Sequence, residues 1–139
     1  KIKNYGWPIA SYGEHYGGKI EKNKKRYEKA PLFKSHKKYG FIEPHKFFDP
    51  SIAPSDILFV PNKFDEDFNN NIFISALGFK NDDGRRSIHT FKLNSNFELK
   101  NHEIISFNDR IRDIEYSEKF NSIFLFLEKT ASIGILEKL

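Results

Sequence analysis

The sequence contains no cysteine and no methionine, and tryptophan occurs once among its 139 residues. The absence of cysteine excludes disulfide bonds and metal sites built on thiolates, although it does not define the cellular compartment. No stretch approaches the ~20 apolar residues that a membrane-spanning helix requires, so we expect no membrane span. The first residues, KIKNYGWPIASYG, lack the apolar segment of a secretory signal and do not begin with methionine. We therefore expect the chain to be a fragment or a processed product.

The net charge of +4 conceals an uneven distribution along the chain. Residues 1–48 contain 12 lysines and arginines against 4 acidic residues, whereas residues 49–139 contain 11 against 15. The basic excess gathers in residues 19–38, KIEKNKKRYEKAPLFKSHKK, which carry none of the usual signatures of a nucleic-acid-binding module. We predict no nucleic-acid partner, because a charge run of this kind is usually a solvated, lysine-rich loop.

Two regions of different character follow one another. In residues 1–56 glycine and proline recur, and neither the helical nor the strand period of hydrophobic residues persists, so we predict a loop-rich segment. A loop of this length is usually functional and lies on a rigid scaffold. From Asp56 onward, short apolar stretches alternate with turn signals such as NDDG at residues 81–84.

The second region predicts an all-β fold. Four strands fit residues 57–107 and three more fit residues 108–139, with short connections between them. Repeated antiparallel units of this size are typical of β-propeller blades, which have four strands each. A β-sandwich also fits the strand spacing, but it does not explain an unfinished second set. We therefore predict a propeller in which the missing strand of the last blade comes from the other end of the protein, upstream of Lys1.

Four motifs occur in a defined order along the chain. They are NYGWPIASYGEHYGG (residues 4–18), DPSIAPSDILF (49–59), NNNIFISAL (69–77) and DRIRDI (109–114). In this order and spacing they resemble the C-terminal part of the glucose/sorbosone dehydrogenase family, soluble pyrroloquinoline quinone (PQQ)-dependent aldose sugar dehydrogenases with a six-bladed β-propeller. The resemblance implies that residues 1–139 are the C-terminal portion of such a propeller. The loop-rich segment would span 1–56, one blade 57–107, and three strands of the last blade 108–139.

Arg110 and Arg112 stand two positions apart in the last motif. In a β-strand such residues point to the same face, so we expect them to project together. In the family the two arginines of this motif lie at the cofactor site, where PQQ presents three carboxylates, and the resemblance implies the same role here. Planar guanidinium groups make bidentate, charge-assisted hydrogen bonds to carboxylates. The alternative is a structural ion pair of one arginine with Asp109 or Asp113.

The resemblance implies two further cofactor contacts. The family has a lysine directly after its G-A-L strand, where this chain has Gly78, and Lys80 stands two residues later. Lys80 is therefore the candidate for that contact. Ser51 matches a small hydroxyl residue of the family near the cofactor, although a turn residue next to Pro50 has the same pattern.

The resemblance places other essential parts of the family's site before residue 1. These are the general-base histidine, the backbone carbonyls that bind Ca²⁺, and further polar cofactor contacts. We expect no catalytic residue among the five histidines of this chain and no zinc or iron site, because their spacing is not that of a metal centre. The cofactors implied are PQQ and Ca²⁺, with the calcium ligands outside this chain.

The function implied is oxidation of an aldose to its lactone by hydride transfer to the quinone, in a periplasmic or secreted protein. The expected partners are a sugar, an electron acceptor that the sequence does not identify, and the remaining propeller blades or a second copy joined through open strand edges. The alternative is a non-catalytic propeller that binds a glycan or a protein, since a fold does not determine a function. The lysine-rich loop of residues 12–50 would then be the contact surface.

Overall fold

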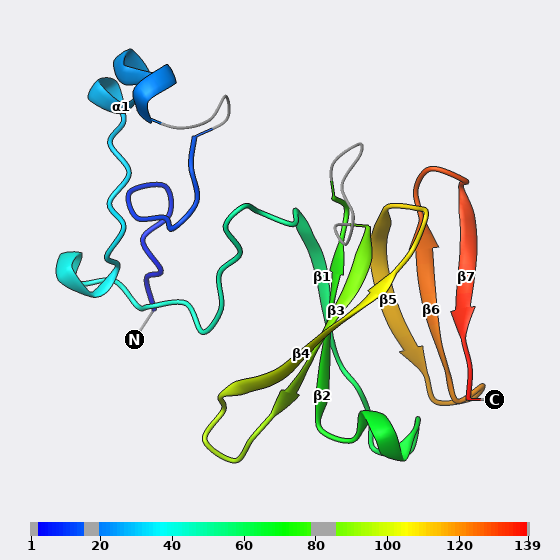
Figure 1. Ribbon diagram of the computed structural model, residues 1–139. Coiled ribbons are helices and arrows are strands. Elements are labelled where there is room, and N and C mark those ends of the chain that lie inside the picture. Colours follow the sequence, from blue (N-terminus) through cyan, green and yellow to red (C-terminus); the bar gives the residue numbers. More distant parts are fainter. Residues whose placement is uncertain (1–2, 16–19, 79–85, 139) are drawn as a thin grey trace. The chain divides into compact units, whose positions relative to one another are not determined.

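The computed structural model describes residues 3–15, 20–78 and 86–138 (Figure 1). The chain divides into two compact units, Lys1–Ser51 and Ile52–Leu139. Lys80 and the NDDG turn lie outside the described residues. Within the part that is described, no helix is long and apolar enough to cross a membrane.

The described residues of the first unit form short helices joined by loops. The helices are the 3-10 helix η1 (Ile20–Lys22), the α-helix α1 (Lys24–Lys29) and the 3-10 helix η2 (Lys37–Tyr39). A parallel bridge pairs Ala10 with Phe33. The sequence predicted loops here, and it did not predict α1 because fewer than two helical turns show no recognisable hydrophobic period.

The second unit begins with a four-stranded antiparallel sheet. Its strands are, in both spatial and chain order, β1 (Pro54–Phe59), β2 (Asn71–Ala76), β3 (Ser87–Leu93) and β4 (Leu99–Ser106). The 3-10 helix η3 (Glu66–Phe68) connects β1 to β2. Each strand pairs with the next one in the chain, which is the meander predicted from the sequence.

A three-stranded antiparallel sheet follows. It consists of β5 (Ile111–Ser117), β6 (Ser122–Leu127) and β7 (Ser132–Leu136) in that order. β7 pairs with β6 along one edge, and its other edge has no partner among the described residues. The prediction of four strands followed by three is confirmed.

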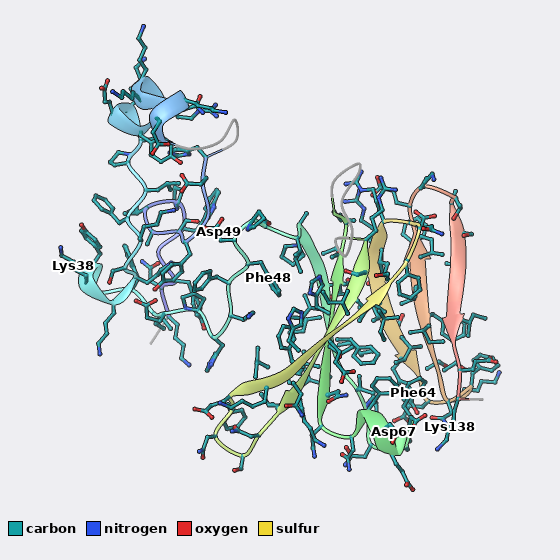
Figure 2. All side chains as sticks on the ribbon, viewed as in Figure 1. Lys38, Phe48, Asp49, Phe64, Asp67 and Lys138 are labelled. Atoms are coloured by element: carbon teal, nitrogen blue, oxygen red, sulfur yellow. The ribbon has the colours of Figure 1, made fainter. Side chains whose placement is uncertain are left out.

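The hydrophobic core lies between the two sheets. Its buried members come from both sheets and from the β1–β2 connection: Val60, Phe64, Phe73, Ile88, Ile111, Ile114, Ile123 and Leu125. At the lower end of the unit, where Figure 2 labels Phe64, this ring packs edge-on against Tyr116 with a centroid distance of 6.2 Å. Burial of this apolar surface is the main force that holds the two sheets together.

Two hydrogen bonds between side chains of β1 and backbone groups of β5 join these strands directly. Ser55 Oγ donates a hydrogen bond to the carbonyl of Ile111 at 2.5 Å, and the N–H of Ile114 donates to Asp56 Oδ2 at 3.2 Å. These bonds fix the beginning of β5 against β1. They therefore position the DRIRDI motif relative to the first sheet.

The sheet faces that point away from the core are also apolar. On the first sheet Ile57 and Phe59 are 53% and 63% exposed. On the second sheet the cross-strand pair Phe126 and Ile133 is 45% and 61% exposed. Apolar surface on both outer faces is what neighbouring blades of a propeller would cover.

Candidate functional site

The candidate site lies at one end of the second unit, which we call the upper rim. At this end β1, β3, β5 and β7 begin and β2, β4 and β6 end (top of Figure 1). The connection 107–110 before β5 and the turn 128–131 before β7 both lie on it. Strand ends and turns on a rigid sheet are common positions for functional side chains.

Arg110 and Arg112 project together at the upper rim and bind the same carboxylate. Arg110 Nη1 lies 3.0 Å from Glu128 Oε1, and Arg112 Nη2 forms an ion pair with Glu128 Oε2. The side-by-side projection predicted from their spacing is therefore confirmed. The predicted alternative, an ion pair with Asp109 or Asp113, named the wrong acid, because among the described residues both arginines pair with Glu128.

The register of β5 and β6 explains why both arginines contact Glu128. The N–H of Glu128 donates to the carbonyl of Arg110 at 2.9 Å, so the two residues lie directly across from one another. The pairing then shifts by one residue after Ile111, which leaves Arg112 in a β-bulge. A bulge re-aims a side chain, and here it brings the second guanidinium to the second oxygen of Glu128.

Asp109 anchors the turn that carries Glu128. Its carboxylate accepts hydrogen bonds from the N–H of Arg110 (2.7 Å), the N–H of Lys129 (2.7 Å), and both the N–H (3.0 Å) and hydroxyl (2.6 Å) of Thr130. Burial acts to raise the pKa of Asp109, but the hydroxyl of Thr130 and these N–H donors outweigh it and hold the pKa below its ordinary value. Asp109 is therefore a structural anion rather than a partner of the arginines.

The arginine pair retains unused hydrogen-bonding capacity. The side chains of Arg110 and Arg112 are 38% and 49% exposed, and each gives one hydrogen bond to Glu128. Arg110 Nε is buried and has no hydrogen-bond acceptor among the described residues. A guanidinium group has five N–H donors, so this cluster leaves several for an added anion.

Two further carboxyl groups meet where β1 lies beside β5. Asp56 and Asp113 share a hydrogen bond, and that bond, together with burial, raises the pKa of Asp113. Burial acts to raise the pKa of Asp56 as well, but the hydrogen bonds from Asp113 and from the N–H groups of Ile57 and Ile114 lower it overall. The pair holds one proton more readily than two separate aspartates would, which is the usual behaviour of neighbouring carboxyls.

The structure also pairs two histidines that the sequence analysis treated separately. His89 Nδ1 lies 2.8 Å from His102 Nε2, and the His102 ring stacks on Phe91 at 4.5 Å. His89 is buried in β3, and His102 is exposed on β4. The contact depends on the β3–β4 register and on its shift between Thr90 and Lys92, so the sequence carries no signal that would have predicted it. Within the described ranges, no group of three or more His, Asp or Glu side chains could hold a metal ion.

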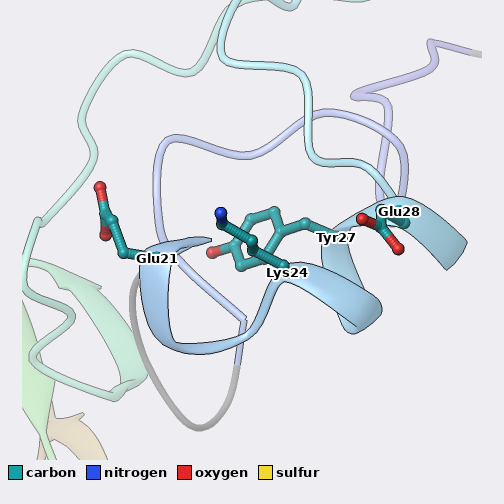
Figure 3. A pocket seen from close by; sticks show the side chains of 4 residues that line it. All are labelled: Glu21, Lys24, Tyr27 and Glu28. Carbon is teal, nitrogen blue, oxygen red and sulfur yellow. The ribbon is translucent and has the colours of Figure 1, made fainter.

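Described residues of the first unit line two of the surface hollows. One, of about 380 Å³, is lined by Glu21, Lys24, Tyr27 and Glu28. Figure 3 shows the two glutamates on opposite sides of Tyr27, so their carboxylates do not converge on one point. The other, of about 410 Å³, is formed by residues 44–50. Neither hollow brings together a set of groups suited to catalysis.

Comparison with known proteins identifies the family. The sequence profile of the family described as Glucose / Sorbosone dehydrogenase matches residues 1–134. The chain belongs to the glucose/sorbosone dehydrogenase family. An uncharacterized protein of Synechocystis sp. (strain ATCC 27184 / PCC 6803 / Kazusa) is 25% identical over 114 residues, which cover 82% of this chain and 24% of that protein.

Solved structures of glucose dehydrogenases share the fold. One, described as a crystal structure of glucose dehydrogenase, superposes with a TM-score of 0.74 at 20% identity, over 99% of this chain and 36% of its own. A second glucose dehydrogenase gives a TM-score of 0.69 at 18% identity and covers 99% and 34%. The predicted all-β propeller fold is confirmed. The chain spans about a quarter to a third of the length of these relatives.

Of the two further residues matched to the family's cofactor contacts, Ser51 ends the first unit and Lys80 lies outside the described residues. Ser51 is exposed and directly precedes Ile52, whose carbonyl accepts from the N–H of Gly78 at 3.1 Å. Gly78 adopts a φ of +56°, a conformation that glycine takes far more readily than lysine. The roles of Ser51 and Lys80 stay predictions.

The residues present fit a polycarboxylate such as the family's quinone. Two partly exposed guanidinium groups that converge on one carboxylate suit a further planar carboxylate. Glu128 neutralises one of the two positive charges, so the cluster keeps a net charge of +1. The site is therefore a positively charged surface with N–H donors that are still free to bind an anion. A cofactor that carries carboxylates requires such a surface.

Proposed function

We propose that the intact protein is a PQQ-dependent sugar dehydrogenase that oxidises an aldose to its lactone. The observation that carries the proposal is the convergence of Arg110 and Arg112 at the rim of a chain that belongs to the glucose/sorbosone dehydrogenase family. When bound, PQQ would supply the quinone that accepts the hydride. The role of this chain is to bind and orient the cofactor's carboxylates.

Each candidate residue has a separate part in that role. Arg110 and Arg112 would donate charge-assisted hydrogen bonds to a carboxylate that approaches the upper rim. The hydroxyl of Ser51 would donate a further bond, and Lys80 would add a positive charge. The general base and the Ca²⁺ ligands would come from parts of the protein outside this chain.

The partners are proposed on the same basis. The exposed pairs Ile57–Phe59 and Phe126–Ile133 would be covered by further propeller blades, and the open edge of β7 would receive an additional strand. The substrate would be an aldose, and the electrons would pass to an acceptor in the periplasm or outside the cell. Self-association through the same edge is the alternative arrangement.

The experiment is reconstitution of the intact protein with PQQ and Ca²⁺, followed by measurement of aldose-dependent dye reduction and of PQQ affinity. Arg110→Ala and Arg112→Ala should each weaken PQQ binding by roughly 10- to 100-fold, the equivalent of about 1.5–3 kcal/mol for a hydrogen bond to a charged group. Lys129→Ala is the matched control, because it removes a positive charge from the same rim and its N–H still binds Asp109. Unchanged PQQ affinity in the double arginine variant would refute the proposal.

A second candidate, a non-catalytic propeller that binds a glycan or protein, is favoured by two observations. Gly78 occupies the position of the family's lysine, and Glu128 already neutralises part of the arginine pair. Under this function the intact protein would not bind PQQ, and acidic ligands would bind the lysine-rich loop of residues 12–50. Replacing the lysines of that loop with glutamate would then abolish binding of the acidic ligand. The Arg110 and Arg112 variants would bind that ligand as the natural protein does.

A further inference from the structure

We propose that Glu128 is a positioning residue of the cofactor site, which holds Arg110 and Arg112 in a shared orientation for a carboxylate ligand. This inference rests on the proposed function and assigns a role to a residue that does not belong to the DRIRDI motif. It follows from the contacts of Glu128, from the hydrogen bonds that fix its turn, and from the two positive charges that its carboxylate pairs with.

The contacts of Glu128 are divided evenly between the two arginines. Oε1 receives Arg110 Nη1 at 3.0 Å, and Oε2 receives Arg112 Nη2. Each oxygen thus binds one guanidinium group. The distance between the two bonded Nη atoms is therefore set by the distance between the two oxygens of one carboxylate. A ligand carboxylate has the same width, so the pair is already spaced for one.

The position of Glu128 is fixed by its backbone. Its N–H donates to the carbonyl of Arg110 at 2.9 Å, in line with the β5–β6 ladder. The next two residues, Lys129 and Thr130, are both held by Asp109. Glu128 therefore stands on a turn that is tied on both sides to the segment that carries the arginines.

Charge explains why a carboxylate is needed at this position. Arg110 and Arg112 are like charges on long, partly exposed side chains, and without a counter-ion they would repel one another and sample many rotamers. Glu128 offsets that repulsion and reduces the freedom of both chains before the ligand arrives. Pre-organisation of this kind increases affinity by lowering the entropy lost on binding.

Glu128 leaves the ligand-binding groups available. One hydrogen bond to each partly exposed guanidinium leaves other N–H groups of both arginines for an incoming anion. If Glu128 instead competed with the ligand, its removal would increase affinity. The sign of the change in affinity therefore separates positioning from competition.

The test uses PQQ binding to the intact protein, measured by fluorescence titration without substrate. Glu128→Ala should weaken PQQ affinity about 5- to 20-fold, and Glu128→Gln should lie between that variant and the natural protein, because its amide oxygen still accepts one guanidinium hydrogen bond. Glu115→Gln is the control for charge, since it removes an exposed carboxylate from β5 that forms no ion pair among the described residues. Its affinity should change less than twofold.

A double-mutant comparison shows whether Glu128 acts through the arginines. In the Arg110→Ala/Arg112→Ala background, Glu128→Ala should have no further effect, whereas a general structural defect would weaken binding by the same factor in both backgrounds. Unchanged or tighter PQQ binding in Glu128→Ala overturns the inference, and so does an additive effect. If instead the arginine double variant itself binds PQQ normally, the proposed function fails, which is a distinguishable result. Glu128→Gln keeps the shape of the side chain and so decides the outcome if Glu128→Ala does not fold.

Discussion

The carboxylate of Asp109 holds Thr130 by two hydrogen bonds, one from its N–H at 3.0 Å and one from its hydroxyl at 2.6 Å. Through this contact the residue before the arginine pair fixes the turn after Glu128. The upper rim thus contains two acids with different contacts. The buried Asp109 binds backbone N–H groups, and the partly exposed Glu128 forms ion pairs with the two arginines. The two roles are separate, and they make different predictions.

Replacing Asp109 should destabilise the protein. Asp109→Ala removes the acceptor of four hydrogen bonds and leaves several N–H donors without a partner, so we expect a loss of about 2–4 kcal/mol in the free energy of unfolding. Urea unfolding of the intact protein measures this loss. Thr130→Val is the graded control, because it removes only the hydroxyl bond and should cost about 1 kcal/mol. Equal stability of Asp109→Ala and the natural protein would contradict the assigned role.

Asp109 should also make stability depend on pH in the acid range. Its pKa in the folded protein lies below the ordinary value near 3.9, so the stability that it contributes is fully present above that value. That contribution is lost as the pH falls through the folded pKa. Asp109→Asn should therefore be less stable than the natural protein at pH 7, and the difference should shrink toward pH 2. Thermal unfolding at a series of pH values tests this prediction.

Asp113 should have the opposite dependence. The pKa of Asp113 is raised, mainly by its hydrogen bond with Asp56, so the folded state binds this proton more tightly than the unfolded state does. The contribution is present below the ordinary Asp pKa and is lost as the pH rises through the raised value. Asp113→Asn should therefore raise the melting temperature at pH 7 by a small amount, on the order of 1 °C for an exposed group, and leave it unchanged at pH 3. A lower melting temperature at pH 7 would contradict it.

The sequence predicted the strands well because their signals are local. The alternation in SIHTFKL and the turns between short apolar runs define β3 and its neighbours without any knowledge of tertiary contacts. Arg110 and Arg112 were likewise predicted to project together from their spacing. In the structure Arg110 precedes β5 and Arg112 lies in a bulge, so their convergence also depends on the irregular register, which the spacing rule does not contain. The start of β1 at Pro54, before the predicted blade boundary at residue 57, shows the usual uncertainty at element ends.

Glu128 could not be predicted from spacing alone. It lies 16 residues after Arg112 in a turn, and its contact with both arginines depends on the β5–β6 register and on the bulge at Arg112. The hydrogen bond between His89 and His102 has the same origin, since it spans two strands. Asp109 appeared in the sequence as an ion-pair candidate, but its burial and its four hydrogen-bond donors follow from the fold. Contacts set by strand register are therefore the part of the site that the sequence did not define.

The core between the two sheets should tolerate truncation poorly. Phe73 is fully buried and faces the second sheet, so Phe73→Ala should cost about 3–5 kcal/mol through lost burial and the cavity that remains. Phe97→Ala is the matched control, because the same atoms are removed from a side chain that is 67% exposed in a turn. That control should change the free energy of unfolding by less than about 0.5 kcal/mol. Similar losses in the two variants would show that the core is not where the structure places it.

The outer face of the second sheet tests the proposal that further blades cover it. Ile133 is 61% exposed within this chain and forms a cross-strand pair with Phe126. If another blade packs on this face in the intact protein, Ile133→Asp buries an unpaired charge and should lower the free energy of unfolding by several kcal/mol. If the face is open to solvent, the same change should have an effect within about 0.5 kcal/mol, as expected for Lys119→Asp in the exposed β5–β6 turn. Denaturant unfolding of the two variants, side by side in the intact protein, distinguishes a covered face from an open one. A negligible effect of Ile133→Asp would remove the argument for a neighbouring blade on this side.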